Sequence, residues 1–155
     1  MNLHISSWIT GFVDGEGCFS VSFSKREKVK TGIEVRPSFS VSQLAPSRKS
    51  LELINNAFGV GGIRYSKKDN CYKYEVRSSK DLRNVVIPHF HKYPLQTTKK
   101  NDFLKLEKVL DLVKRNHHLN IDGMKSIIDI VFNDGNGLPT NRSYTKEQLL
   151  KLLKS

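Results

Sequence analysis

Four segments of the chain alternate apolar and polar residues, and this pattern restricts the possible fold more than any other feature of the sequence. The segments are residues 18–26, 34–43, 61–66 and 71–78. A period of two with one apolar face is typical of half-buried antiparallel strands. We therefore expect two strand pairs, each with an apolar face against helices and a polar face open to solvent or to a partner.

Helices are predicted before, between and after these strand pairs, where apolar residues recur at helical spacing. Their expected starts lie near Ser7, Ser47, Ser78, Thr97, Asp122 and Thr145. Gly59 and Pro88 are expected to end the second and third helices, and Thr145 with Gln148 forms a capping-box pattern. The order αββαββα followed by further helices predicts an α+β fold with helices on one face of a sheet, in one domain that spans residues 1–155.

Positive charge is concentrated in the predicted strand pairs. Lys and Arg number 26 against 15 Asp and Glu, which gives a net charge of +11 at pH 7. Residues 19–50 carry a net charge of +5 and residues 60–100 one of +7. This balance points to a polyanion. Since no apolar run approaches the length of a membrane span, we expect nucleic acid and no membrane.

Cys18 and Cys71 lack metal-ligand spacing, which favours a reduced compartment.

The polar face of the predicted strands carries Ser, Arg, Lys and Glu in place of bulky apolar groups. Such side chains can bond base edges as well as phosphates, whereas a purely electrostatic surface needs only Lys and Arg. A solvated sheet face would be the simpler interpretation of one strand, but four strands that carry the whole charge excess favour nucleic acid. The residues expected to contact it are Ser22, Ser24, Arg26, Lys28, Glu34, Arg36, Ser38, Ser40, Arg64, Ser66, Lys68, Lys73, Glu75 and Arg77.

The first predicted helix ends in two acids and two glycines, in the segment DGEG that follows Val13. Acids at a helix C-terminus oppose the macrodipole, so stability does not explain Asp14 and Glu16. A bound cation would explain them, because Mg²⁺ takes carboxylate and carbonyl oxygens. Ser7 and Gly11 form a stripe of small residues on this helix, which indicates close approach of another backbone.

Residues 9–17, ITGFVDGEG, resemble the motif of the LAGLIDADG homing endonucleases. Three later landmarks match the same family in order: FSVSQ at residues 39–43, GVG at 59–61 and YPLQT at 93–97, the last followed by Lys99 and by Asp102-Phe103. The resemblance covers nearly the whole chain. It implies an αββαββα fold, with a saddle-shaped sheet that binds the DNA major groove and with additional C-terminal helices.

The resemblance also implies roles for individual residues. Glu16 would bind a divalent metal, Mg²⁺ with Mn²⁺ or Ca²⁺ able to occupy the site, assisted by the Gly15 carbonyl. Gln43 would position water or the metal, and its place in the strand pattern puts it on the helix side of the sheet. Lys99, or its neighbour Lys100, would be the basic group near the scissile phosphate. These roles describe site-specific cleavage of double-stranded DNA.

The motif occurs once, whereas cutting both DNA strands needs two sites. A homodimer would supply the second site and predicts a pseudo-palindromic target. By the resemblance, the motif helices of two copies pack together, with Ser7, Thr10, Gly11 and Asp14 at the interface. Asp14 would have a structural or secondary role.

Two other functions remain open on the sequence. The chain could be an intron maturase that binds structured intron RNA, or a DNA-binding regulator that has lost cleavage. Family habit implies an intron-borne gene in an organelle, chloroplast or mitochondrion.

Overall fold

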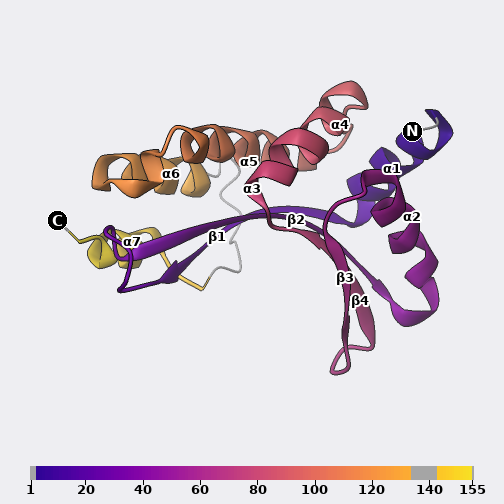
Figure 1. The fold of residues 1–155 in the computed structure, drawn as a ribbon, viewed down its shortest axis with the longest axis horizontal. Helices are drawn as coiled ribbons and strands as arrows, with labels where there is room; N and C mark the ends of the chain where they lie inside the picture. The colour runs from indigo at the N-terminus through magenta and orange to yellow at the C-terminus, as the bar shows by residue number, and fades with distance from the viewer. Residues whose placement is uncertain (1–2, 134–142, 155) are drawn as a thin grey trace. The chain divides into compact units, whose positions relative to one another are not determined.

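The computed structural model describes residues 3–133 and 143–154 (Figure 1). The chain divides into two compact units. The first comprises Met1–Ser20 and Ser38–Leu104, and the second comprises Val21–Pro37 and Lys105–Ser155. The first two strands contribute residues to both units, so the division does not follow the boundaries of secondary structure.

The four predicted strands form one sheet with the order β1-β2-β4-β3. β2 pairs antiparallel with β4, and β4 pairs antiparallel with β3. The register places Phe39 opposite Val76 and Ile63 opposite Tyr74, so the apolar residues of neighbouring strands share one face. The strand bounds are β1 Gly17–Lys25, β2 Ile33–Leu44, β3 Gly62–Ser66 and β4 Cys71–Val76.

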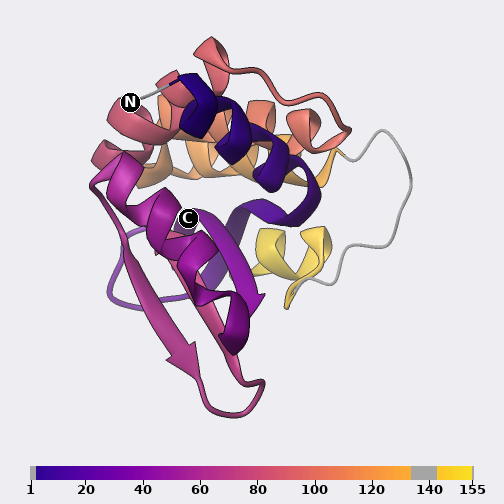
Figure 2. The same cartoon turned by 90° about the vertical axis from the view of Figure 1, so that its right-hand side faces the viewer.

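The helices confirm the predicted α+β class and most of the expected starts. Their bounds are α1 Leu3–Glu16, η1 Ala45–Ser47, α2 Arg48–Phe58, α3 Ser79–Asp81, η2 Leu82–Val86, α4 Ile87–Lys92, α5 Lys99–Lys114, η3 His117–Leu119, α6 Ile121–Phe132 and α7 Lys146–Leu152. α2 ends at Gly59, which has a φ of 69° as a C-terminal glycine should. Within the first unit, α2 lies alongside β3 and β4 (Figure 2).

The core of the first unit is an aromatic cluster around Phe39, whose side chain is fully buried. The ring centroids of Phe19, Tyr74 and Phe90 lie 5.1, 6.2 and 5.7 Å from that of Phe39. Phe58 adds a fourth ring at 6.2 Å. These rings come from β1, β4, α4 and α2, and Phe39 itself comes from β2, so the cluster joins five elements. Edge-to-face pairs stabilise it beyond the burial of apolar area alone.

The prediction that Pro88 ends the third helix is wrong. The helical segment begins after Ser78, whose hydroxyl accepts a hydrogen bond from the Asp81 N–H at 3.2 Å, and continues through Pro88 to Lys92. It passes through the π-helical turn η2 directly before α4, and Pro88 lies in the first turn of α4. There its missing N–H is tolerated, and the wider π turn absorbs the change in hydrogen-bond register.

In the second unit, α6 contacts the end of β1, where Phe132 stacks on Phe23 at 6.4 Å between ring centroids. α6 begins one residue before Asp122 because Asn120 caps it, accepting a hydrogen bond from the Gly123 N–H at 2.8 Å. The capping box of Thr145 at the start of α7 is confirmed. After α7, Lys154 N–H donates to the carbonyl of Thr31 at 3.0 Å.

Candidate active site and nucleic-acid interface

The last residue of α1 meets the end of β2. Glu16 is exposed, and its Oε2 accepts a hydrogen bond from Gln43 Nε2 at 3.2 Å. The same Gln43 nitrogen also donates to the Ser42 carbonyl at 2.9 Å. Gln43 therefore lies on the helix side of the sheet, as its position in the strand pattern predicts, and orients the Glu16 carboxylate.

Lys99 reaches the same helix end from the start of α5. Its Nζ donates to the carbonyl of Val13 at 3.1 Å, and the side chain is half-buried, whereas Lys100 is exposed. The Val13 carbonyl is one of the last four of α1, which have no intrahelical partner. A cation at this position also interacts favourably with the helix macrodipole. The structure thus brings Glu16, Gln43 and Lys99 to one end of α1.

Asp14 holds α1 to the segment before α5. Its carboxylate accepts hydrogen bonds from Gln96 N–H at 2.9 Å, Thr97 N–H at 3.1 Å and Thr97 Oγ1 at 2.8 Å. Slight burial raises the pKa of Asp14, but these hydrogen bonds and the nearby Lys99 outweigh it, so the pKa lies below its usual value. Asp14 therefore remains ionised in the folded chain over the neutral range.

The exposed face of α1 differs from the predicted interface at Thr10. Ser7 and Gly11 are exposed, and a Cβ at Gly11 would meet nothing within 4 Å. Trp8 is 37% exposed and stacks on Phe12 at 5.0 Å between ring centroids. Thr10 instead lies on the buried side and is 6% exposed.

Thr10 faces inward because it has partners inside its own chain. Its hydroxyl donates to the Tyr93 carbonyl at 2.9 Å and lies 3.2 Å from His89 Nε2. The contact with His89 spans 79 positions in the sequence. No local pattern indicates such a pair, and the same is true of the bonds between Asp14 and Gln96.

The polar face of the sheet in the first unit is organised around Glu75. Its Oε1 accepts from Arg64 Nη2 and Arg77 Nε, both at 2.8 Å, and its Oε2 lies 3.1 Å from Lys73 Nζ. Desolvation raises the pKa of Glu75, but the three cations outweigh it and hold the pKa below its usual value. Glu75 and Ser40 lie on this polar face, but they are only 8% and 6% exposed, so the expectation that they are open to a partner is wrong.

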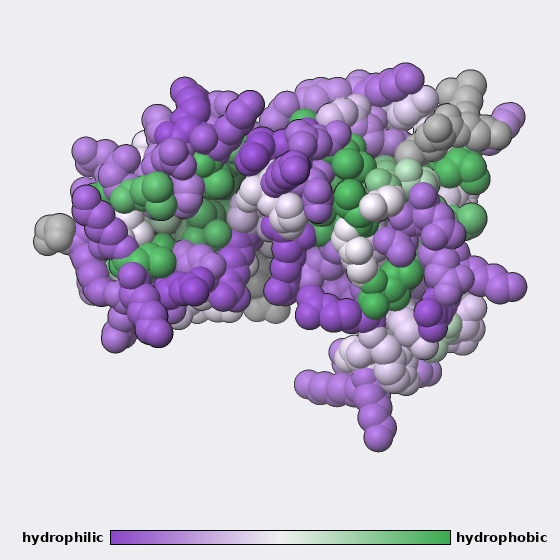
Figure 3. Space-filling model, viewed as in Figure 1, coloured by the Kyte–Doolittle hydropathy of each residue, from purple (hydrophilic) through white to green (hydrophobic). Residues whose placement is uncertain are grey.

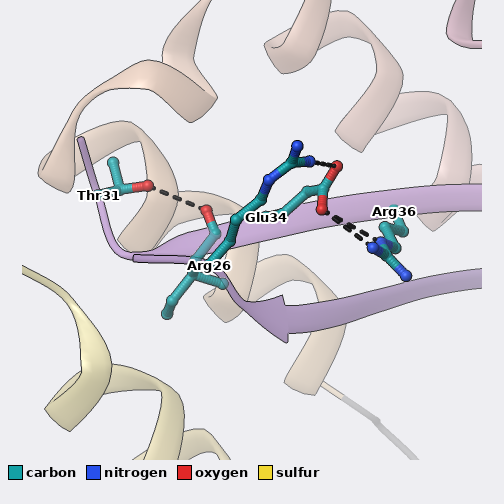
Figure 4. Close-up of polar contacts among 5 residues, drawn as sticks. Arg26, Thr31, Glu34 and Arg36 are labelled. Atoms are coloured by element: carbon teal, nitrogen blue, oxygen red, sulfur yellow. Dashed lines mark hydrogen bonds and ion pairs between the residues drawn. The ribbon is translucent and has the colours of Figure 1, made fainter. Parts of the chain in front are cut away.

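A similar but more open arrangement occurs in the second unit (Figure 4). Glu34 accepts from Arg26 Nη1 at 2.8 Å and from Arg36 Nη2 at 3.1 Å. Slight burial raises the pKa of Glu34, and the two arginines lower it below its usual value overall. In the neighbouring turn, Thr31 Oγ1 donates to the Ile33 carbonyl at 3.0 Å.

The other predicted contact residues are exposed or half-buried. They are Ser22, Ser24, Arg26, Lys28, Glu34, Arg36, Ser38, Arg64, Ser66, Lys68, Lys73 and Arg77. The tip of the β3–β4 hairpin projects hydrophilic side chains at the bottom of Figure 3. In residues 3–133 and 143–154, no group of three or more His, Cys, Asp and Glu side chains could hold a metal ion, and no helix is long and apolar enough to cross a membrane.

Residues 9–110 match the sequence profile of the LAGLIDADG endonucleases. The chain belongs to this family. The matched range contains Glu16, Gln43 and Lys99. Probable intron-encoded endonuclease 2 of Neurospora crassa is 34% identical to this LAGLIDADG chain over 124 residues, which cover 79% of this chain and 27% of the relative. DNA endonuclease I-CeuI of Chlamydomonas moewusii is 30% identical over 87 residues, 56% of this chain and 40% of the relative.

Solved LAGLIDADG structures share the fold. The homing endonuclease I-TnaI superposes with a TM-score of 0.80 at 33% identity, over 95% of this chain and 94% of that one. The I-LtrWI homing endonuclease bound to target DNA superposes with a TM-score of 0.80 at 30% identity, over 93% of this chain and 53% of that one. The chain spans about a quarter of the length of several curated relatives, between 24% and 27%.

Proposed function

We propose that this LAGLIDADG chain is the catalytic and DNA-binding unit of a site-specific double-strand DNA endonuclease. The observation that carries the proposal is the meeting of Glu16, Gln43 and Lys99 at the C-terminal end of α1. Relatives named as endonucleases and similar structures bound to DNA support it. The cationic polar face of the strands is suited to the phosphate backbone.

Glu16 fits a divalent cation, and we propose Mg²⁺, with Mn²⁺ or Ca²⁺ able to replace it. The carboxylate is exposed, and the Gln43 amide orients it without neutralising its charge. The Gly15 carbonyl belongs to the open end of α1 and would add an oxygen of the kind these ions prefer. The related I-SmaMI has been solved on an uncleaved DNA target in the presence of calcium ions, at a TM-score of 0.81 and 34% identity.

Gln43 and Lys99 would each have a separate role beside a metal bound at Glu16. A metal bound at Glu16 would supply Lewis-acid stabilisation of the phosphodiester. Gln43 holds the carboxylate in one orientation and can position water with its amide. Lys99 places a positive charge beside the same helix end, where it would stabilise charge that develops on the phosphate.

We further propose that two motif units act together, as a homodimer on a pseudo-palindromic target. One chain offers one Glu16, and cutting two strands requires two such acids. The exposed stripe of Ser7 and Gly11, beside the exposed Trp8, would let a second α1 approach closely. In support, this chain covers 53% of I-LtrWI and 47% of I-SmaMI, about half of each DNA-bound chain.

Cleavage is tested by selection on a randomised DNA library. The protein binds in Ca²⁺, bound DNA is recovered, and Mg²⁺ is then added before the ends are sequenced. Wild-type protein should make paired cuts in a long site, and Glu16→Gln should keep binding but lose cleavage. Glu52→Gln, on α2 in an ion pair with Arg48, is the charge-matched control and should cut normally. Full-rate cutting by Glu16→Gln would disprove the proposed metal ligand.

Other outcomes identify the alternatives. Specific binding of DNA without cuts by the wild-type protein would indicate a DNA-binding regulator. Enrichment of structured intron RNA and of no DNA would indicate a maturase. Several relatives are named as intron-encoded or intron products, and we infer from this a gene borne on an intron, in a mitochondrial or chloroplast genome.

The dimer is tested with Gly11→Leu. Because nothing lies within 4 Å of a Cβ at this position, the side chain should not disturb the fold of one chain. It would block close approach of a second α1. Light scattering should give twice the chain mass of 17.7 kDa for wild-type protein and a single chain mass for the variant, with unchanged circular dichroism. A variant that still dimerises would place the interface elsewhere.

A further inference from the structure

We propose that Glu75 is a positioning residue for sequence specificity, which holds Arg64, Lys73 and Arg77 in fixed places for reading DNA. This inference rests on the proposed DNA-binding function. Attraction of phosphates needs only cations, so it does not explain an acid in the middle of the cationic face.

The geometry shows one carboxylate shared by three cations. Both Arg64 and Arg77 lie 2.8 Å from Oε1, and Lys73 lies 3.1 Å from Oε2. In the register of β3 and β4, Arg64 is directly opposite Lys73, a like-charge pair that would otherwise be repulsive. Glu75 follows two positions after Lys73 on the same face of β4 and compensates this repulsion.

Burial separates the acid from the cations that surround it. The side chain of Glu75 is 7% exposed, against 70% for Arg64, 48% for Lys73 and 62% for Arg77. Ser40, opposite Glu75 in β2, is also buried, so these two residues form the floor of the patch. A DNA duplex that approached this face would meet the three cations and not the carboxylate.

A buried acid in a DNA-binding face has opposite effects on sequence-independent binding and on sequence discrimination. It removes one positive charge from the surface that attracts phosphates, which weakens sequence-independent binding. It also fixes the planar guanidinium groups of Arg64 and Arg77, and fixed bidentate donors discriminate between bases in the major groove. Preorganisation of donors favours reading of base edges over loose phosphate contact.

The same device occurs in the second unit, where Glu34 holds Arg26 and Arg36. The Glu34 side chain is 29% exposed, against 7% for Glu75. Exposed ion pairs fix side chains weakly because solvent competes for them. We therefore expect the influence on specificity to be graded, with Glu75 stronger than Glu34.

The test compares Glu75→Gln, Glu75→Asp and the charge-matched Glu52→Gln on the site selected by the wild-type protein and on a scrambled duplex, at one fixed salt concentration. For Glu75→Gln, the ratio of specific to non-specific affinity should fall by about tenfold, because scrambled DNA binds more tightly and the donors lose their orientation. Glu75→Asp keeps the charge and shifts the carboxylate. It should leave non-specific binding unchanged and still lose discrimination.

A positional measurement separates positioning from mere structural support. The base pairs at which Glu75→Gln loses preference should be those at which Arg64→Met or Arg77→Met loses preference, measured at a temperature at which circular dichroism shows every variant to be folded. An unchanged specificity ratio, or a loss spread evenly over the site, would overturn the inference. If the wild-type protein selects no DNA site at all, the proposed function fails instead, so the two failures are distinguishable. Should Glu75→Gln not fold, Glu75→Asp decides alone.

Discussion

Mild acid should weaken the fold of the first unit through one buried imidazole, that of His89. The ring is 7% exposed and lies among the rings of Phe58, Phe90 and Tyr93, with centroids at 5.1, 4.7 and 5.2 Å. Burial lowers the pKa of His89 from 6.5 to about 4. The folded chain therefore keeps this histidine neutral at a pH where the unfolded chain protonates it.

The sign and size of the effect follow from this difference. Above pH 6.5 the His89 ring is neutral in both the folded and the unfolded chain, so the fold loses no stability through its protonation. As the pH falls towards 4, only the unfolded state takes up the proton, so the free energy of unfolding decreases. At about 1.4 kcal/mol per pH unit, the loss reaches about 2 kcal/mol near pH 5. The pKa values of Asp14, Glu34 and Glu75 are lowered in the folded chain, so the stability that these carboxylates contribute is lost as the pH falls through and below their ordinary values of 3.8 and 4.5, under the lower limit of the measurement described next.

Urea unfolding followed by circular dichroism, from about pH 7.5 to about pH 5, measures the effect. The His89→Gln variant should lose most of the pH dependence, although it is less stable overall, whereas His4→Gln at an exposed position should retain it. Identical pH dependence in wild-type protein and His89→Gln would refute the reasoning. So would an NMR titration of the His89 ring with a pKa near that of a free histidine.

Three further outcomes are expected. Phe39→Ala should lower the free energy of unfolding by about 3–5 kcal/mol, measured by urea unfolding, because it empties the centre of the aromatic cluster. Gly61→Ala should destabilise by about 1–3 kcal/mol in the same assay, since φ is +80° and a Cβ would lie 2.6 Å from the Glu75 carbonyl oxygen. Lys99→Met should slow cleavage by about 100-fold in single-turnover assays with little change in DNA binding, and Lys100→Met should not. Equal losses in the two lysine variants would contradict the geometry.

The fold was predictable where local chemistry decides the structure. Period-two alternation located all four strands, and Gly59 marks the end of α2 because a left-handed residue is needed there. Pro88 misled the prediction because a π turn before it supplied a geometry that single-residue preferences do not reveal. The α+β class and the αββαββα order were therefore accessible from the sequence, but the continuous helical segment was not.

The sequence indicated which face or helix end carries the candidate residues better than it indicated how far each one is buried. Alternation identified the polar face of β2 and β4, yet it could not show that Ser40 and Glu75 are buried, the latter among three longer cationic side chains. Likewise, helical spacing could not place Thr10, because its inward position depends on His89 and Tyr93, far along the chain. Polar side chains become buried when distant partners satisfy them, and those partners have no local signal.

The hydrogen bonds of Asp14 to Gln96 and Thr97 have a consequence for how such a protein could acquire new targets. They join the end of α1 to the start of α5, so Glu16 and Lys99 each lie two residues from one shared joint. None of these residues projects from the polar face of the sheet. Under the proposed function, exchange of strand side chains would alter which DNA is recognised while the Asp14 hydrogen bonds keep Glu16 and Lys99 in place.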